Sequence, residues 1–233
     1  MYFLCIRGDR LNEINYNELY RIMGAIYEAN LPIVFKGGLI TRLIVNSDSF
    51  RQTTDIDGSW LDDEYSNEVI KKEIQKALQK VDKEYRVAID RSLNPQKGMS
   101  ARIRIEKVGQ TVAKLDLDHN VGNTKGIYTV DDFSFLGVEA IDIIADKYFS
   151  ISSDTIRRRT KDLLDFYVLQ DAVKIDKSEL LTNLKSRGRK LGTFSVFNSA
   201  KEDLRVGYVN LKNVSNKPDF EDVYLYIEKF IEQ

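Results

Sequence analysis

FKGGLITRLIV at residues 35–45 and RQTTDIDG at residues 51–58 are the segments that decide the fold of this 233-residue chain. Apolar residues at 33–35 predict a short buried strand, Gly37-Gly38 predicts a turn, and a brief helix follows to about Val45. A second short strand begins at or includes Asp55-Ile56-Asp57. Because alternate side chains of a strand share a face, these two carboxylates stand side by side, about 7 Å apart at the backbone.

The two carboxylates and the glycine turn predict phosphoryl chemistry. Carboxylates this close repel each other unless a cation lies between them, and hard oxygen ligands favour Mg²⁺, which takes further ligands from phosphates. Gly37 and Gly38 let the backbone approach a triphosphate, and the next helix offers unpaired N–H groups. We therefore expect Asp55 and Asp57 to hold Mg²⁺ and the Lys36-Gly37-Gly38 turn to bind an NTP. A merely solvated Asp-x-Asp is the alternative.

Composition narrows the class of protein. The chain is 42% hydrophobic, which is enough for one large domain or two small ones. The single cysteine, Cys5, excludes an internal disulfide, and we expect it to be a buried strand residue. The N-terminal apolar run is too short for a signal peptide, and no stretch approaches the roughly 18 apolar residues of a membrane span. These features predict a cytoplasmic protein without a membrane partner.

Charge is balanced overall but uneven locally. The net charge of −1 does not indicate nucleic-acid binding. Residues 151–190, however, hold ten Lys or Arg against six Asp or Glu, mostly in the basic clusters 157–161 and 185–190. Each cluster predicts either contacts to an RNA backbone or an ordinary solvated helix face.

The order of predicted elements indicates an α+β fold. Strands dominate the first half and helices the second, which predicts one domain over residues 1–136 and a helical domain over 137–233, with a boundary near 133–137. The expected strands beyond the first two span 85–89, 101–107 and 111–118. The expected helices span 13–29, 64–80, 138–149, 155–171, 177–186 and 219–231, with a less distinct one at 199–205.

The strand at 111–118 alternates cleanly and forms a predicted hairpin with 101–107 through Gly109-Gln110. One face of this hairpin is apolar and predicts core: Ile103, Ile105, Ala113, Leu115 and Leu117. The other face mixes cations with carboxylates: Arg102, Arg104, Glu106, Lys114, Asp116 and Asp118. Such a face suits a nucleotide cleft, and it is equally compatible with a solvated surface.

The segments at 35–45 and 51–58 resemble the first motif of nucleotidyltransferases of the polymerase-beta superfamily. They are most similar to the AbiEii abortive-infection toxins, in which Gly-Gly precedes Arg-x-(Ser/Thr)-x-Asp-Ile-Asp. Arg51, Thr53 or Thr54, Asp55 and Asp57 occupy these positions, and Gly58 departs from the larger apolar residue that is usual there. The resemblance implies a nucleotidyltransferase-like mixed sheet with flanking helices, followed by a helical domain, with Arg51 and Thr54 contacting the nucleotide.

The resemblance extends to a third carboxylate and to the helical half. It implies Asp116, with Asp118 as the alternative, as a further metal ligand or general base. Residues 136–147 and 159–165 are similar to the later motifs of the toxins, which implies catalytic roles for Lys147 and Asp162 and nucleotide contacts for Lys147 and Asp165. Asp165 and Asp162 remain alternatives for the functional member of their pair.

The surroundings of these residues suggest how they are paired. Lys147 falls on an apolar helix face and needs an anionic partner, either a phosphate or Asp162, unless it extends to water. Arg158, Asp162 and Asp165 form a stripe on the next predicted helix that lines a cleft, or else Arg158 pairs with Asp162 within the helix. His119 is expected in a turn.

These features lead to one main functional hypothesis and two alternatives. The resemblance implies a Mg²⁺-dependent nucleotidyltransferase toxin that transfers NMP from an NTP to RNA, with the tRNA 3′ end as the target, and a separately encoded antitoxin. An aminoglycoside-like small molecule is the alternative acceptor, with Asp62-Asp63-Glu64 as its acidic contact. A nucleotide-binding regulator without transfer activity is the third possibility.

Overall fold

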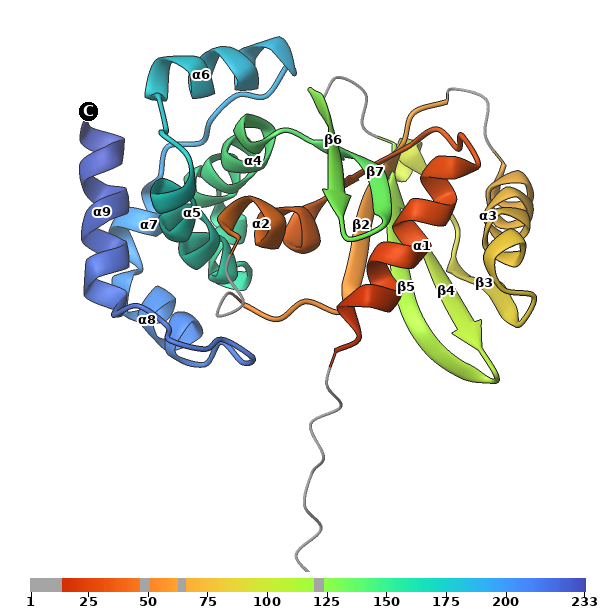
Figure 1. The fold of residues 1–233 in the computed structure, drawn as a ribbon. Helices are drawn as coiled ribbons and strands as arrows, with labels where there is room; N and C mark the ends of the chain where they lie inside the picture. The colour runs from red at the N-terminus through yellow and green to blue at the C-terminus, as the bar shows by residue number, and fades with distance from the viewer. Residues whose placement is uncertain (1–13, 47–50, 63–65, 120–123) are drawn as a thin grey trace, which may run out of the picture.

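The computed structural model describes residues 14–46, 51–62, 66–119 and 124–233. Within them, one mixed sheet of seven strands has the order β3-β4-β5-β2-β1-β7-β6 (Figure 1). The strands are β1 (Ile33–Lys36), β2 (Asp55–Trp60), β3 (Tyr85–Arg91), β4 (Ala101–Lys107), β5 (Gln110–Asp118), β6 (Lys125–Val130) and β7 (Phe133–Val138). The continuous apolar run of β1 fits its place inside the sheet, where both of its faces are covered.

Helices flank the sheet and then form the second half of the chain. The two helices α1 and α3 pack against each other and against the sheet, whereas α2 leads from β1 toward the later helices (Figure 1). The first three helices are α1 (Tyr16–Glu28), α2 (Gly37–Val45) and α3 (Asn67–Val81). The later ones are α4 (Ala140–Ser152), α5 (Lys161–Ala172), α6 (Lys177–Ser186), α7 (Ser195–Ser199), α8 (Lys201–Val209) and α9 (Phe220–Glu232).

The hydrophobic core is continuous between the sheet and the later helices. One cluster of buried side chains includes Ile22 of α1, Phe35 of β1 and Phe166 of α5. The helix α2 supports this continuity because it contacts β2 on one side and α4 and α5 on the other. The alternation expected for the hairpin is confirmed, since Ile103, Ile105, Ala113, Leu115 and Leu117 are all buried.

Three features of the second half differ from the sequence-based expectations. The hairpin of β6 and β7 was not predicted, because apolar and polar residues do not alternate clearly along β6. The predicted helix over 155–171 is wrong in its first part, where a 3₁₀ turn over Asp154–Arg158 precedes α5. The strand β7 extends to Val138, so the predicted boundary at 133–137 falls within a strand; the division into two domains stays a prediction.

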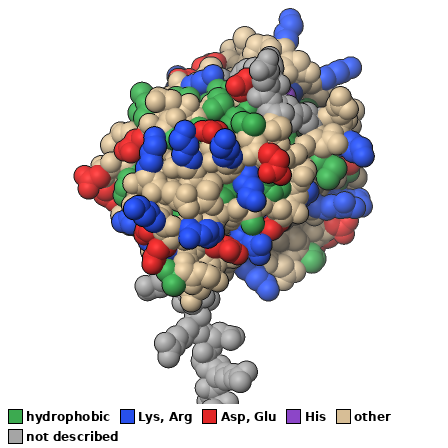
Figure 2. All heavy atoms as spheres, turned by 90° about the vertical axis from the view of Figure 1, so that its right-hand side faces the viewer, with side chains coloured by type: hydrophobic (Ala, Val, Ile, Leu, Met, Phe, Trp, Pro, Cys, Tyr) green, Lys and Arg blue, Asp and Glu red, His purple; other side chains and the backbone are tan. Residues whose placement is uncertain are grey.

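The surface beside α3 carries both signs of charge. Figure 2 shows that Lys and Arg side chains alternate with Asp and Glu on the side of the molecule where α3 and β3 lie. Exposed hydrophobic residues there, such as Val69 and Val81, lie among charged neighbours. Within the described ranges, no helix is both long enough and apolar enough to cross a lipid bilayer.

Candidate active site

The turn between β1 and α2 brings the glycine pair against Asp57. Strands β1 and β2 are antiparallel, and Lys36 is paired with Asp57. Gly37 has φ +71°, and a Cβ at this position would lie 2.1 Å from Oδ2 of Asp57. Only glycine combines this backbone conformation with so close an approach. The glycine therefore permits the carboxylate to sit directly against the start of α2.

The parallel pairing of β2 with β5 adds a second pair of carboxylates. Asp57 is in register with Asp116, and Ser59 with Asp118. Residues paired in this way point to the same face of the sheet, as do alternate residues of one strand. Asp55, Asp57, Asp116 and Asp118 thus face the same side, although the two strands are more than fifty residues apart in the sequence.

These side chains line one cavity of about 930 Å³ between the sheet and the later helices. Its lining includes every residue of the first motif to which a role was assigned: Lys36, Gly37, Gly38, Arg51, Thr54, Asp55 and Asp57. Asp116, Asp118 and Arg102 contribute from the hairpin. The later helices contribute Lys147, Arg159, Lys161 and Arg189, so cations and carboxylates face each other across the cavity.

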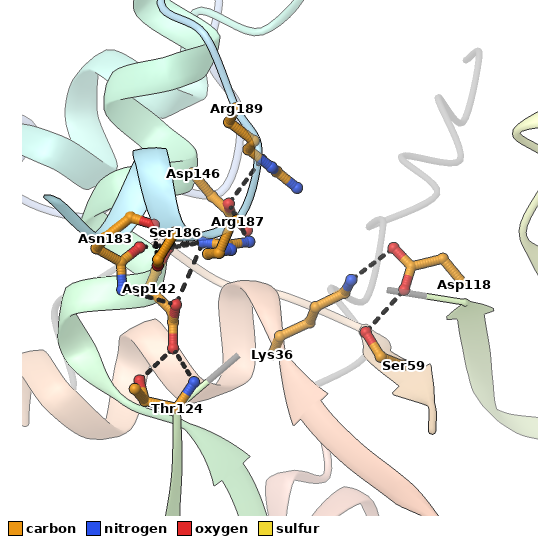
Figure 3. A network of polar contacts seen from close by, with 10 residues as sticks. All are labelled: Lys36, Ser59, Asp118, Thr124, Asp142, Asp146, Asn183, Ser186, Arg187 and Arg189. Carbon is orange, nitrogen blue, oxygen red and sulfur yellow. Dashed lines mark hydrogen bonds and ion pairs between the residues drawn. The ribbon is translucent and has the colours of Figure 1, made fainter. Parts of the chain in front are cut away.

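Two of the carboxylates hold basic partners within the sheet. Asp116 accepts two hydrogen bonds from Arg102, at 2.9 Å from Nε and 2.7 Å from Nη2. Asp118 is paired with Nζ of Lys36 at 2.5 Å and accepts a hydrogen bond from the Ser59 hydroxyl at 2.7 Å (Figure 3). Both side chains are therefore fixed in direction beside the Asp55–Asp57 pair.

The electrostatics single out Asp57. Burial raises the pKa of its carboxyl, and the nearby Asp116 raises it further, while Lys161, Lys147 and Lys36 oppose the shift. Asp57 is partly buried, and a carboxylate in such a place that faces a second carboxylate is costly to ionise, a cost that a bound cation relieves. This environment suits a metal ligand.

Mg²⁺ fits the donors that the cavity offers. It prefers oxygen ligands, and commonly uses one or two carboxylates together with waters and substrate phosphates. Asp55 and Asp57 supply such a pair. Within the described residues, no group of three or more His, Cys, Asp and Glu side chains is gathered closely enough to hold a metal ion. A role for Asp116 as a third ligand thus requires Arg102 to release it, and it stays a prediction.

A buried ionic cluster lies behind the cavity wall. Lys147 Nζ is 2.7 Å from carboxylate oxygens of both Asp162 and Asp165, and neither aspartate side chain is exposed. Arg51 reaches Asp165 through Nε at 3.1 Å and Nη2 at 3.2 Å, which ties the loop before β2 to α5. Burial by itself would lower the pKa of Lys147, but the two aspartates outweigh it and raise this pKa. Lys147 therefore stays cationic.

The same balance acts on Asp165. Burial would raise its pKa, but Lys147 and Arg51 outweigh this effect and hold the pKa below the usual range. The distances of 2.7 Å show that Lys147 has the expected anionic partner, Asp162, and a second one, Asp165. Because Asp162 and Asp165 face Lys147 and do not line the cavity, the geometry supports positioning roles for them and direct contact for Lys147.

Several expectations about side chains need correction. Arg158 is exposed in the 3₁₀ turn, so the predicted stripe on one helix is wrong, and Arg159 is the residue that pairs with Asp162, at 2.7 Å. Lys161 lines the cavity and has no carboxylate partner in the described residues. From the sequence, Lys161 was predicted only as one member of the basic cluster 157–161. His119 contacts the Trp60 carbonyl at 3.1 Å. Cys5, Asp63 and Glu64 lie outside the described residues.

Arg187 has a structural role in the basic cluster at 185–190. The Arg187 side chain is only 2% exposed and pairs with Asp142 at 3.3 Å and with Asp146 at 2.8 Å. Figure 3 shows these residues with Thr124 and Asn183, which also bind Asp142. The expectation that this whole cluster contacts RNA is therefore wrong for Arg187, which joins α6 to α4.

The fold is similar to that of solved structures, whereas the sequence has no match among the families and curated proteins compared. Among solved structures, the chain is similar to JHP933 from Helicobacter pylori, with 15% identity, a TM-score of 0.57, and coverage of 94% of this chain and 89% of that one. A second structure from H. pylori, described as a nucleotidyltransferase, has 16% identity, a TM-score of 0.56 and coverage of 94% and 92%.

The nucleotidyltransferase toxin MenT4 from Mycobacterium tuberculosis gives a weaker match, with 14% identity, a TM-score of 0.45, and coverage of 70% of this chain and 60% of that one. The two H. pylori structures confirm the expected fold class, a mixed sheet with flanking helices that is followed by further helices.

Proposed function

We propose that this chain is a Mg²⁺-dependent nucleotidyltransferase that transfers NMP from an NTP to RNA. The observation that carries the proposal is the position of Asp55 and Asp57 in one cavity with the Gly37-Gly38 turn. A paired set of carboxylates beside a close-approach turn suits a metal ion and a triphosphate together. A site that only binds a nucleotide has no comparable need for the paired carboxylates, which argues against a regulator without transfer activity.

The proposed reaction forms a bond between an acceptor hydroxyl oxygen and the α-phosphorus of the NTP. The bond from that phosphorus to the β-phosphate oxygen breaks, and pyrophosphate leaves. The hydroxyl proton goes to a carboxylate, for which Asp116 is our candidate and Asp118 the alternative. Mg²⁺ held by Asp55 and Asp57 would supply charge stabilisation for the attacking and leaving oxygens.

The basic residues of the cavity are proposed to bind the phosphates and other parts of the nucleotide. Lys147 is one of the lining residues of the cavity, and Asp162 and Asp165 hold its Nζ at 2.7 Å from behind the wall. Lys161, the first residue of α5, adds a positive charge to the cavity wall at the end of the helix whose dipole favours an anion. We assign the β- and γ-phosphates to Lys147 and Lys161, and nucleotide contacts to Arg51 and Thr54.

We further propose that the reaction arrests growth, with the tRNA 3′ end as the target and a separately encoded antitoxin. The sequence resemblance to AbiEii toxins supports this role. A small cationic acceptor such as an aminoglycoside is less compatible with the cavity, because Asp116 and Asp118 already hold Arg102 and Lys36.

A label-transfer experiment tests the proposal. Purified protein and Mg²⁺ are incubated with each α-labelled NTP and with total tRNA, and in parallel with aminoglycosides. We expect label on RNA, released pyrophosphate, and no transfer when EDTA removes the metal. Label on the drug alone would assign the other acceptor, and NTP binding without any transfer would identify a regulator.

Growth on expression provides the second test. Asp57→Ala should abolish both label transfer and growth arrest, because it removes a proposed metal ligand. Asp203→Ala is a matched control, since Asp203 is an exposed acid on α8 that does not line the cavity. Undiminished toxicity of Asp57→Ala would contradict the proposed site.

A further inference from the structure

A second hollow adjoins the cavity at Asp55. It is a groove of about 680 Å³ between the start of α1 and the first half of β5. Thr54 and Asp55 line both this groove and the larger cavity. Sites for nucleotide-sized ligands commonly have volumes of roughly 300–1,000 Å³, so each hollow is large enough for one nucleotide. The proposed metal ligand Asp55 is thus the wall between two separate spaces.

The groove exists because β2 is shorter than β5. The strand β2 starts at Asp55, which is paired with Lys114. The preceding residues of β5, from Gln110 to Ala113, are paired with β4 on one side, and in the described part of the chain no strand covers their other side. Their backbone N–H and C=O groups are therefore available to a ligand that lies in the groove.

The side chains of the groove offer neutral hydrogen-bonding groups and an exposed lysine, which suit a nucleotide. Apart from the proposed metal ligand Asp55, the described residues of the groove do not offer the free carboxylates that a polycationic ligand requires. Neutral hydrogen-bonding groups come from Asn15, Thr54, Gln110 and Thr111. Lys114 is exposed and holds no carboxylate in the described residues, although it stands beside Asp55. An unpaired ammonium group attracts a phosphodiester and repels a cationic drug.

The remaining charges of the groove are already satisfied. Glu18 accepts a hydrogen bond from the Tyr85 hydroxyl at 2.5 Å. Lys107 is paired with Asp82 at 2.8 Å and lies 3.8 Å from Glu18. Glu18 is thus not available to an aminoglycoside, and Lys114 is the basic residue of the groove that can still accept an anionic partner.

We infer that this groove binds the 3′-terminal nucleotide of an RNA acceptor and that Lys114 contacts its phosphodiester. The inference rests on the proposed nucleotidyl transfer. In an in-line displacement the acceptor hydroxyl and the leaving pyrophosphate lie on opposite sides of the α-phosphorus. With the triphosphate at the Gly37-Gly38 turn, the groove beyond Asp55 lies on the side from which an acceptor approaches. The groove thus determines the class of acceptor.

The test separates RNA binding from transfer. Binding of a single-stranded RNA oligonucleotide with a free 3′-hydroxyl is measured by fluorescence anisotropy over a range of salt concentrations, for wild type, Lys114→Ala and Lys72→Ala. Lys72 is an exposed lysine of α3 and serves as the charge-matched control. Transfer kinetics with the same RNA and the Kd for NTP are measured in parallel.

We expect Lys114→Ala to weaken RNA binding roughly five- to tenfold and to reduce the slope of log K against log salt by about 0.7, as the loss of one phosphate contact does on a single strand. The KM for RNA should rise by a similar factor, with the Kd for NTP unchanged. Lys72→Ala should behave as wild type. An unchanged slope in Lys114→Ala, or an aminoglycoside as the better acceptor, would overturn the inference.

The two proposals fail in different ways. If wild type binds RNA through Lys114 but transfers no label, the proposed reaction is wrong and the groove assignment holds. If wild type labels RNA and Lys114→Ala has the same KM and the same salt slope, the reaction holds and the groove assignment is wrong.

Discussion

Asp57 lies against Gly37 on one side and faces Asp116 on the other. Its folded-state pKa is raised above the value in the unfolded chain, first by burial and then by Asp116. A raised carboxyl pKa means that the folded state binds the proton more tightly than the unfolded state does. The free energy of unfolding therefore decreases as the pH rises from about 3.9, the unfolded value, through the folded pKa.

Asp57→Asn removes this cost without a large change of shape. In metal-free protein at pH 7, we expect a Tm above that of wild type, with the difference disappearing below about pH 3.9, where the wild-type carboxyl is protonated in both states. Transfer activity should fall at least about 10³-fold, because the loss of metal-ion stabilisation is worth several kcal/mol. Calorimetry at both pH values and the label assay check the two parts.

The matched comparison is Asp118→Asn. Asp118 is stabilised by Lys36 and Ser59, so this substitution should not raise the Tm. A Tm of metal-free Asp57→Asn below that of wild type at pH 7 would show that the carboxylate is stabilising, contrary to our account.

Lys147 is the residue with the largest expected effect on stability. Lys147→Met leaves Asp162 and Asp165 buried without their shared cation, and breaking such a buried pair costs about 3–5 kcal/mol. Urea unfolding measures this loss. Adding Asp162→Asn should restore part of it, because one of the uncompensated charges is removed. A single-variant loss within about 0.5 kcal/mol would contradict the charged cluster.

The turn between β1 and α2 acts at the scale of an element, because it determines where α2 begins relative to β2. Gly37 and Gly109 have nearly the same positive φ, +71° and +72°. A Cβ on Gly37 would meet Asp57 at 2.1 Å, whereas a Cβ on Gly109 would meet nothing within 4 Å. An alanine at Gly109 therefore introduces backbone strain alone, whereas an alanine at Gly37 introduces backbone strain and a clash with Asp57.

Gly109→Ala should cost about 1–2 kcal/mol, the cost of a left-handed conformation for a residue with a Cβ. Gly37→Ala should cost clearly more and should also weaken Mg²⁺ binding, because Asp57 or the turn must move. Chemical denaturation and metal titration of both variants check this expectation. Equal losses of stability, with unchanged Mg²⁺ affinity, would remove the argument that Gly37 makes room for Asp57.

At the scale of the whole molecule, the cavity depends on the junction between the sheet and the later helices. Arg187 of the segment after α6 is paired with Asp142 and Asp146 of α4, while Asp142 also accepts a hydrogen bond from the Thr124 backbone N–H at 2.7 Å (Figure 3). This network fixes α4, and α4 carries Lys147 to the cavity.

Arg187→Met should therefore lower the free energy of unfolding by about 3 kcal/mol, toward the lower end for a broken buried pair, because Asp142 retains other hydrogen bonds. Lys185→Met is the matched control on the exposed side of the same basic cluster, with an expected change within about 0.5 kcal/mol. If Arg187→Met is as stable as wild type and instead loses RNA affinity, Arg187 contacts RNA and its structural role is wrong.

Much of the local structure follows from the sequence alone. The period of two in the hairpin of β4 and β5 predicts which face of each strand is buried, and the structure confirms it. Helices are predicted over 13–29 and 219–231, and α1 and α9 confirm them. The glycine turn and the Asp-Ile-Asp strand are also local, because the residues that define each motif are neighbours in the chain. The hairpin of β6 and β7 escaped prediction because its outer strand is only half covered and its alternation is weak.

Pairing between distant residues was decided by the tertiary structure. Lys36 meets Asp118 across 82 residues, and Arg51 meets Asp165 across 114. Side-chain periodicity predicts whether a residue such as Lys36 faces the core or the opposite side of its element. Many aspartates and glutamates lie on the same side, so periodicity does not identify the partner. Strand register and helix packing determine which acid becomes the partner. They bring together segments that are distant in the sequence, and the sequence separation of two segments does not predict their distance in space.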